Sequence, residues 1–205
     1  MHVALFPLHT VLFPDGVLPL RVFEARYLDM VRDCLKNDLP FGVCLIRRGS
    51  EVGTPAHIED VGCLASIIGW DMQQLGVLNL RTLGIQRFRV RDQHREANAL
   101  LIGDVEVIAP DNDHDLSPAH APCADLLRRV IDDLSAQRAQ AEASALDANP
   151  FNAPYRLNSS VWVGNRLCEV LQVPLKAKQK LMELDDASAR LDIVTKYLRQ
   201  HSVFK

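Results

Sequence analysis

The 205-residue sequence has no long apolar run, no strongly basic region and few aromatic residues. No apolar stretch approaches the roughly 20 residues that cross a bilayer, so we expect no transmembrane helix. The first residues lack a basic segment, and Pro7 and Pro14 interrupt the apolar ones, which argues against a secretory signal peptide. We therefore expect a cytoplasmic protein with reduced thiols and no membrane partner.

Cysteine is scarce and scattered, with no Cys-x-x-Cys pair, which argues against a disulfide framework and a zinc ribbon. The five cysteines are Cys34, Cys44, Cys63, Cys123 and Cys168. Their apolar or helical surroundings predict buried structural thiols rather than nucleophiles, since a reactive thiolate needs an electropositive, accessible setting. The seven histidines have no partner at i+4 and no nearby cysteine. We expect no metal and no cofactor.

Residues 111–115, DNDHD, begin like a calcium loop, but the pattern is incomplete. Leu116 stands where the loop needs glycine, and Pro122 stands where it needs a bidentate acid. A plain linker is the better interpretation, because both the turn residue and the terminal ligand are missing.

Catalytic signatures are also missing. A phosphate-binding loop needs two glycines five residues apart, followed by lysine, and no two glycines here have that spacing. The HExxH, GxSxG and GxGxxG patterns do not occur either. The 23 basic and 26 acidic residues give a net charge of −3, spread over both halves. We therefore expect no ATP hydrolysis, and a nucleic-acid partner is disfavoured.

Residues 1–109 consist mostly of short apolar runs separated by turn residues, which is typical of a sandwich or barrel. The predicted strands are Val3–Leu8, Leu18–Phe23, Phe41–Ile46, Cys63–Trp70, Val77–Leu83, Phe88–Gln93 and Leu100–Ile108. One helix is predicted over residues 24–37, with Tyr27, Val31, Cys34 and Leu35 on one face. Gly16 is expected to supply a positive φ in a Pro-Asp-Gly turn.

Residues 110–117 are polar and acidic and predict a linker, with domains at 1–112 and 113–205. Beyond this linker the apolar period changes to 3.6, which predicts about four helices. The expected stripes are Leu126, Val130 and Leu134; then Leu157, Val161, Gly164, Cys168 and Leu171; then Leu191, Val194 and Leu198.

Three further features mark the helix ends in this second region. Pro174 is expected in the first turn of a helix that runs through Leu184. Asp185 or Asp186 is expected to cap the last helix. The Ala-rich stretch 136–148 is interpreted as a solvated helix end.

Residues 4–31, ALFPLHTVLFPDGVLPLRVFEARYLDMV, resemble the signature of the Lon protease N-terminal domain family. The matching parts are a Phe-Pro-Leu strand at 6–8, a Leu-Phe-Pro-x-Gly turn at 12–16, the Pro-Leu-x-hydrophobic-Phe-Glu segment at 19–24, and Arg-Tyr at 26–27. Further matches follow in order at 41–43, 62–65, 84, 87–90, 105, 175–183 and 190–191. The resemblance therefore extends over nearly the whole chain.

The resemblance implies an α+β fold: a PUA-like β pseudo-barrel with one inserted helix, followed by a C-terminal α-helical bundle. In full-length Lon this region recognises and delivers protein substrates, while the ATPase and the Ser-Lys peptidase lie downstream. No position of this sequence matches the catalytic dyad. The expectation is a non-catalytic, stand-alone Lon N-domain protein. Its expected partners are unfolded or extended polypeptide and the Lon machinery.

Trp70, Met72 and Leu75 flank a predicted hairpin connection, where apolar residues are unusual. They are the first candidates for polypeptide binding, because Trp offers a large contact area and Met adapts to varied partners. The alternative is that Trp70 ends its strand inside the barrel and Met72 caps the core.

Arg87, Arg89 and Arg91 alternate with apolar residues, so a strand would place all three guanidinium groups on one face. This stripe is the second candidate, for acidic peptide or for RNA phosphate. The alternative is a solvated outer face with acids nearby. PUA folds often bind RNA, so by analogy an RNA-binding protein is the alternative function.

Overall fold

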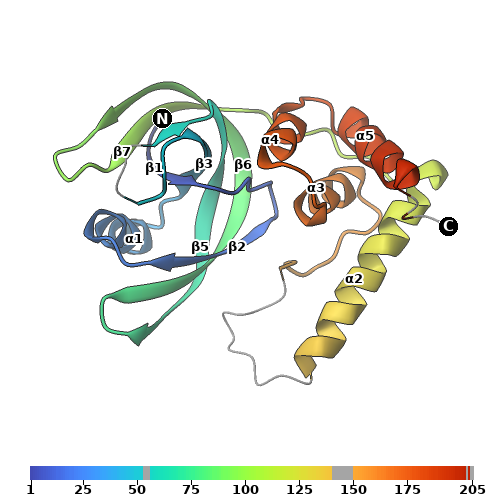
Figure 1. Ribbon diagram of the computed structural model, residues 1–205, viewed down its shortest axis with the longest axis horizontal. Helices are drawn as coiled ribbons and strands as arrows, with labels where there is room; N and C mark the ends of the chain where they lie inside the picture. Colours follow the sequence, from blue (N-terminus) through green and yellow to red (C-terminus); the bar gives the residue numbers. More distant parts are fainter. Residues whose placement is uncertain (53–55, 140–149, 202, 204–205) are drawn as a thin grey trace. The chain divides into compact units, whose positions relative to one another are not determined.

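The computed structural model describes residues 1–52, 56–139, 150–201 and 203, drawn in colour in Figure 1. The chain divides into two units, Met1–Ala109 and Pro110–Lys205. The first unit contains the strands and one helix, and the second contains helices.

Seven strands and one helix are found among the described residues of the first unit. The strands are β1 (His2–Leu8), β2 (Val17–Val22), β3 (Phe41–Arg48), β4 (His57–Ile58), β5 (Val61–Gln74), β6 (Val77–Arg95) and β7 (Leu101–Val107). Two strands predicted over 77–83 and 88–93 are one continuous strand, β6, and the two-residue β4 was not predicted. The helix α1 (Ala25–Asn37) confirms the predicted one. Leu35 differs from expectation, because it is exposed rather than on the buried face.

The strands close into a ring. Neighbours in the sheet follow the order β1-β7-β6-β5-β3-β4, and a parallel pairing of β1 with β3 completes the circle. The ring pairs are otherwise antiparallel, and β2 lies outside the ring on β6. This arrangement confirms the α+β pseudo-barrel with an inserted helix and following helices.

Side chains of the strands alternate between two apolar clusters. In β1, Val3 and Leu5 belong to one cluster, and Phe6 and Leu8 belong to the other. The buried face of α1 packs into the second cluster, where the rings of Phe6 and Tyr27 stack with centroids 4.0 Å apart. The apolar strand runs seen in the sequence therefore reflect burial on both faces of the sheet.

The turn before β2 differs from the prediction. Asp15, not Gly16, has the positive φ, at 63°. Gly16 donates its backbone N–H to the Phe13 carbonyl, and Gly84 exchanges bonds of 2.8 Å with this turn. Gly84 itself cannot be larger, because a Cβ there would lie 2.2 Å from the Phe13 carbonyl oxygen. The close approach of two backbones therefore requires glycine in β6.

The described part of the second unit contains five helical segments: η1 (Pro118–His120), α2 (Ala121–Ala139), α3 (Ser160–Val170), α4 (Leu175–Glu183) and α5 (Ala187–Gln200). Pro174 immediately precedes α4, and the Asp186 carboxylate caps α5 by accepting from the Ser188 and Ala189 N–H groups. Both confirm the prediction. Most of the Ala-rich stretch 136–148 lies outside the described residues.

The apolar stripes are confirmed on α5 and shifted on α2. Leu191, Val194 and Leu198 are buried as predicted. On α2, however, the fully buried residues are Cys123, Leu127 and Ile131, whereas the predicted Leu126, Val130 and Leu134 are only half-buried. The two sets have the same spacing of four and are offset by three residues, which places their faces about 60° apart around the helix.

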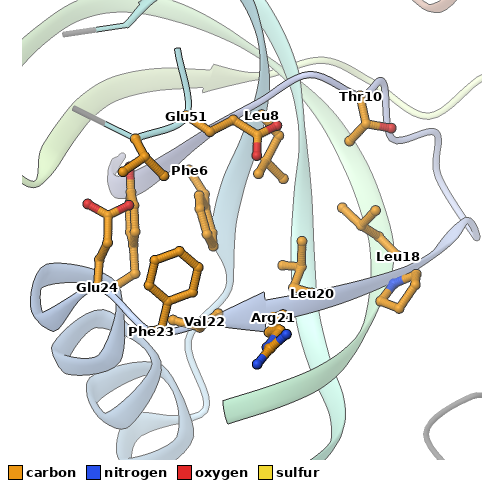
Figure 2. A pocket seen from close by; sticks show the side chains of 13 residues that line it. Phe6, Leu8, Thr10, Leu18, Leu20, Arg21, Val22, Phe23, Glu24 and Glu51 are labelled. Atoms are coloured by element: carbon orange, nitrogen blue, oxygen red, sulfur yellow. The ribbon is translucent and has the colours of Figure 1, made fainter. Parts of the chain in front are cut away.

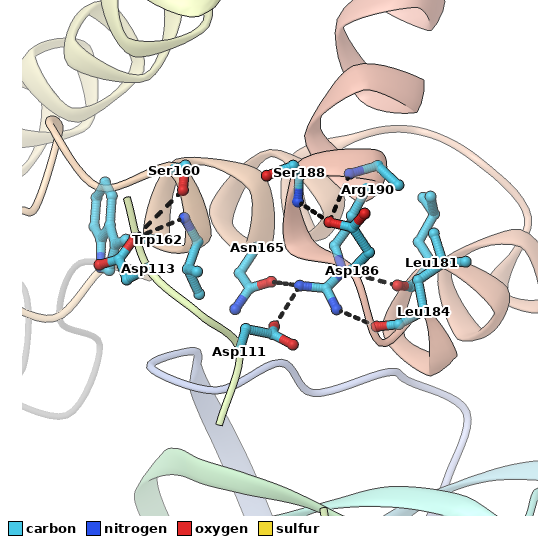
Figure 3. Close-up of polar contacts among 12 residues, drawn as sticks. Asp111, Asp113, Ser160, Trp162, Asn165, Leu181, Leu184, Asp186, Ser188 and Arg190 are labelled. Carbon is cyan, nitrogen blue, oxygen red and sulfur yellow. Dashed lines mark hydrogen bonds and ion pairs between the residues drawn. The ribbon is translucent and has the colours of Figure 1, made fainter. Parts of the chain in front are cut away.

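A buried arginine joins four segments of the helical unit (Figure 3). Arg190 Nη1 donates to Asp111 Oδ2 and Asn165 Oδ1, each at 2.8 Å. Its other nitrogens donate to the carbonyl oxygens of Leu181 and Leu184 at 2.8 and 2.7 Å. The side chains of Arg190 and Asp111 are only 1% and 3% exposed. The guanidinium thus holds α3, α4, α5 and the segment before η1 together.

Residues 110–117 are therefore an ordered part of the helical unit rather than a free linker. Besides Asp111, Asp113 accepts bonds from Ser159 Oγ and the Val161 N–H at the start of α3. The Leu116 N–H donates to the Asn158 carbonyl oxygen at 2.7 Å. Of the acidic residues that suggested a solvated linker, Asp111 is a buried acceptor, whereas Asp113 and Asp115 remain exposed.

We predict that Arg190→Ala destabilises the helical unit by about 3–5 kcal/mol, because it leaves the buried Asp111 carboxylate without its main partner. Lys196→Ala, an exposed position on the same helix, is the control and should change stability by less than about 0.5 kcal/mol. Urea unfolding monitored by near-UV circular dichroism measures both. Equal midpoints for the two variants would contradict a fastening role for Arg190.

Candidate functional site

The first half of β6 is the centre of a three-stranded ribbon. On one side Leu80 lies opposite Trp70 of β5, and on the other side it lies opposite Leu20 of β2. Directly opposed residues in antiparallel strands project from the same face. Trp70, Leu80 and Leu20 therefore form one cross-strand row.

The two faces of this ribbon differ in polarity. The apolar face carries the Trp70–Leu80–Leu20 row, and Leu80 belongs to the core cluster beneath α1. The next row toward the hairpin turn consists of Asp71, Asn79 and Arg21, whose side chains alternation places on the opposite face. The ribbon is thus apolar toward the core and polar on the other face.

The apolar face extends beyond the covered core at its hairpin end. Trp70 is 55% exposed, Met72 is 46% exposed, and Leu75 in the turn is 93% exposed. Trp70 and Met72 both belong to β5, whose register with β6 shifts between Asp71 and Gln74. The structure combines the two alternatives drawn from sequence, since Trp70 lies on the core-facing side of its strand but remains accessible. Figure 1 shows the β5–β6 hairpin projecting below the ring. We call Trp70, Met72 and Leu75 the hairpin patch.

A cavity of about 340 Å³ lies beside β2, at the other end of the same apolar face (Figure 2). Its lining residues come from β1, β2, the start of α1 and the segment at 51–52. They are Phe6, Leu8, Thr10, Leu18, Pro19, Leu20, Arg21, Val22, Phe23, Glu24, Tyr27, Glu51 and Val52. Leu20 belongs to both the cavity and the row that reaches Trp70.

Few charged groups border this apolar cavity. Glu24 forms an ion pair with Arg26 at 2.8 Å. The Glu51 carboxylate accepts from the backbone N–H of His9 at 2.6 Å. Burial raises the pKa of the Tyr27 hydroxyl above its usual value, against the smaller opposing effect of Arg26, so this group stays neutral at physiological pH. The site has the polarity of a binding surface, with carboxylates only at its rim.

The arginine stripe does not form the accessible surface that the sequence suggested. Arg87 is only 4% exposed, and it lies opposite the buried Cys63. Arg91 donates through both Nε and Nη2 to Glu106 Oε2 of β7. Arg89 is half-buried and also lies opposite Glu106 in the sheet register. A register shift between Val90 and Asp92 interrupts the alternation, so the three guanidinium groups do not form one exposed face.

The cysteines are all free and buried, as predicted. Burial raises the pKa of the Cys34 thiol to about 11 and that of Cys168 to about 12, and it raises the pKa of Cys44 further. Within the described residues there is no group of three metal-ligating side chains. No helix among them is long and apolar enough to cross a bilayer.

Comparison with known proteins assigns the family. Residues 2–200 match the model of the ATP-dependent protease La (LON) substrate-binding domain. The chain belongs to this family. It is 26% identical over 203 residues to Lon protease 2 of Myxococcus xanthus, covering 96% of this chain and 23% of that protein. Over 110 residues, 52% of this chain and 24% of the relative, it is 30% identical to protein cereblon of Danio rerio.

Solved structures of Lon N-terminal domains have the same fold. The chain is 34% identical to a Lon N-terminal domain protein from Xanthomonas campestris, with a TM-score of 0.75 over 96% of this chain and 98% of that one. The N-terminal domain of Lon protease from the Mycobacterium avium complex gives a TM-score of 0.63 at 14% identity, over 98% and 100% of the two chains. The chain thus spans a whole Lon N domain and about a quarter of the length of the curated relatives.

Sequence reasoning found the hairpin patch and missed the cavity. The patch has a local signal, because apolar residues stand at a predicted turn. The cavity depends on where β2 pairs, and no single stretch of sequence carries that information. The Pro19 position was the one available signal, since proline within a strand is typical of a sheet edge.

We predict that the buried thiols make the protein less stable at high pH. The unfolded chain releases thiol protons above about pH 8.5, whereas the native chain keeps them, so the free energy of unfolding falls as pH rises. The free energy of unfolding of the parent should therefore fall relative to that of Cys168→Ala, by up to about 1.4 kcal/mol per pH unit between pH 9 and 11. Urea titrations of both proteins at several pH values measure this difference. A pH-independent difference would show that Cys168 titrates alike in both states.

Proposed function

We propose that this protein binds unfolded or extended polypeptide through the apolar face of the β2–β6–β5 ribbon, as a substrate-recognition module. The observation that carries the proposal is the row from the half-exposed Trp70 through the buried Leu80 to Leu20 at the cavity. The row gives a partner an accessible apolar side chain, Trp70, on one side of the buried Leu80 and the cavity residue Leu20 on the other side.

The composition of the patch suits clients of varied sequence. Trp70 supplies a large, rigid contact area, and Met72 supplies a flexible one that adapts to different side chains. Exposed apolar residues grouped in this way are typical of interaction sites. The family to which the chain belongs is described as a substrate-binding domain, which supports the same class of function.

The alternative of RNA binding has weaker support in the first unit. Of the three arginines proposed as a phosphate contact, Arg87 is buried and Arg91 is paired with Glu106. Phosphate contacts require accessible cations, and their affinity falls steeply with salt. Polypeptide binding by the hairpin patch should instead change little between 50 and 300 mM salt.

We predict that the triple variant Trp70→Ala, Met72→Ser, Leu75→Ser binds a permanently unfolded protein at least tenfold more weakly. A central aromatic residue alone contributes about 2 kcal/mol or more to a typical interface, and these side chains contribute little to the core. Fluorescence anisotropy with a labelled, reduced and carboxymethylated protein measures the affinity. Thermal unfolding checks that the fold is kept.

The control is Ile193→Ser, an exposed apolar position that lines a groove between α4 and α5 in the helical unit. We expect its affinity to equal that of the parent. Loss of binding by this control but not by the triple variant would move the site to the helical groove. Unchanged binding by both would refute a role for the hairpin patch.

A further inference from the structure

One edge of β2 is unpaired within the described part of the chain. β2 pairs with β6 on one side, and the sheet records no other partner for it. The Gly84 N–H donates to the Gly16 carbonyl oxygen at 2.8 Å. Because backbone groups alternate along an antiparallel strand, residues 18, 20 and 22 turn their N–H and C=O groups to β6. Val17, Pro19 and Arg21 turn theirs to the open edge.

The position of Pro19 agrees with this alternation of backbone groups along β2. Proline has no N–H to give to a ladder, so it is confined to positions that face away from the paired neighbour. Pro19 also reduces uncontrolled pairing at this edge, because it removes one of its donors. The edge keeps the N–H groups of Val17 and Arg21 and three carbonyl groups.

The cavity runs along this open edge. Every residue from Leu18 to Phe23 lines it, and no lining residue comes from β6. Figure 2 shows β2 along one side of the cavity, with Phe6, Leu8 and Glu51 across from it. Its volume falls in the range of roughly 300–1,000 Å³ that is typical of ligand pockets. An extended chain placed here meets a backbone edge and an apolar floor together.

The charges at the rim favour a cationic side chain on the occupant. Two of the lining side chains, Glu24 and Glu51, are acidic and stand on the rim, whereas the basic lining residue, Arg21, turns its side chain away from the cavity. Arg26 already neutralises Glu24, whereas Glu51 is held by a backbone N–H and by a 3.5 Å contact with His9. Glu51 therefore remains the carboxylate best placed to meet a lysine or arginine.

We propose that an extended segment of a client polypeptide binds as an added strand on the open edge of β2, with apolar side chains in the cavity and a lysine or arginine beside Glu51. This inference rests on the proposed polypeptide-binding function and specifies how the backbone of the client is held. Strand addition obtains affinity from main-chain bonds and selects sequence at alternate side chains. Because the main-chain bonds are the same for any sequence, this mode suits clients of varied sequence.

Amide exchange of the parent protein tests the backbone contacts directly. The probe is an end-capped nine-residue peptide in which leucine or phenylalanine alternates with threonine, with one lysine near an end. We expect saturating peptide to slow exchange of the Val17 and Arg21 amides at least tenfold, while Leu18 and Leu20, already bonded to β6, change little. N-methylation at alternate residues removes the backbone N–H groups on one edge of the peptide. Of two such peptides, methylated at positions that differ by one residue, we expect only the one that keeps its N–H groups toward β2 to bind.

Two variants separate the backbone from the side chain. Arg21→Pro removes the outward N–H, and Arg21→Ala keeps it while removing the same side chain. We expect at least tenfold weaker peptide binding by Arg21→Pro and near-parent binding by Arg21→Ala, at equal melting temperatures. If Arg21→Pro does not fold, the exchange experiment on the parent decides.

Glu51→Gln tests the charge contact. This variant should lower affinity about threefold for the lysine peptide and leave the affinity for a matched glutamine peptide unchanged.

The outcomes distinguish this inference from the proposed function. Peptide binding that weakens in the hairpin-patch variant but leaves Val17 and Arg21 exchanging as before would overturn strand addition and keep the proposed function. Absence of binding by both the peptide and the unfolded protein would overturn both. Equal affinity of the two N-methylated peptides would also refute strand addition.

Discussion

The pairing of β6 with three other strands is the constraint on which the first unit depends. Its first half lies between β5 and β2, and its second half lies between β5 and β7. One 19-residue strand therefore fixes the register of the ring and of the projecting ribbon. The register places Trp70 and Leu20 on the face of Leu80, so the same pairing that builds the core also produces an apolar surface beyond it. Gly84 allows this, because only glycine fits against the Phe13 backbone.

The helical unit depends on a different kind of interaction. There Arg190 of α5 donates four bonds of 2.7–2.8 Å to groups of α3, of α4 and the residue that follows it, and of the segment before η1. A buried charge of this kind costs much to desolvate, so it stabilises the fold only with a complete set of partners. Directional bonds to a few fixed acceptors thus specify the helix arrangement, and Gly164 of α3 lies against Leu191 of α5, where an added Cβ would make an ordinary contact at 3.6 Å.

The sequence predicted the positions of the strands and helices better than it predicted which of their residues are buried. Apolar periodicity located six of the seven strands and the helices, because it records which side chains meet a core. It misjudged Arg87 and Asp111, since these polar residues were taken as solvated when tertiary partners in fact bury them. It misplaced the positive φ at Gly16 because aspartate also adopts this conformation, and it placed the α2 stripe about 60° around the helix from the buried one. For the site, the exposed hairpin was predictable from local residues, whereas the cavity depends on long-range pairing of β2.

The most direct test of the central claim is to map client contacts by methyl NMR on the labelled protein with a saturating unfolded client. The account predicts that the largest shifts fall on Met72, Leu75, Leu20 and Val22, a set that joins the hairpin patch to the cavity. Methyl groups of the α4–α5 groove, such as those of Leu181 and Val194, should move little. Shifts concentrated in that groove, with the ribbon unchanged, would contradict the account.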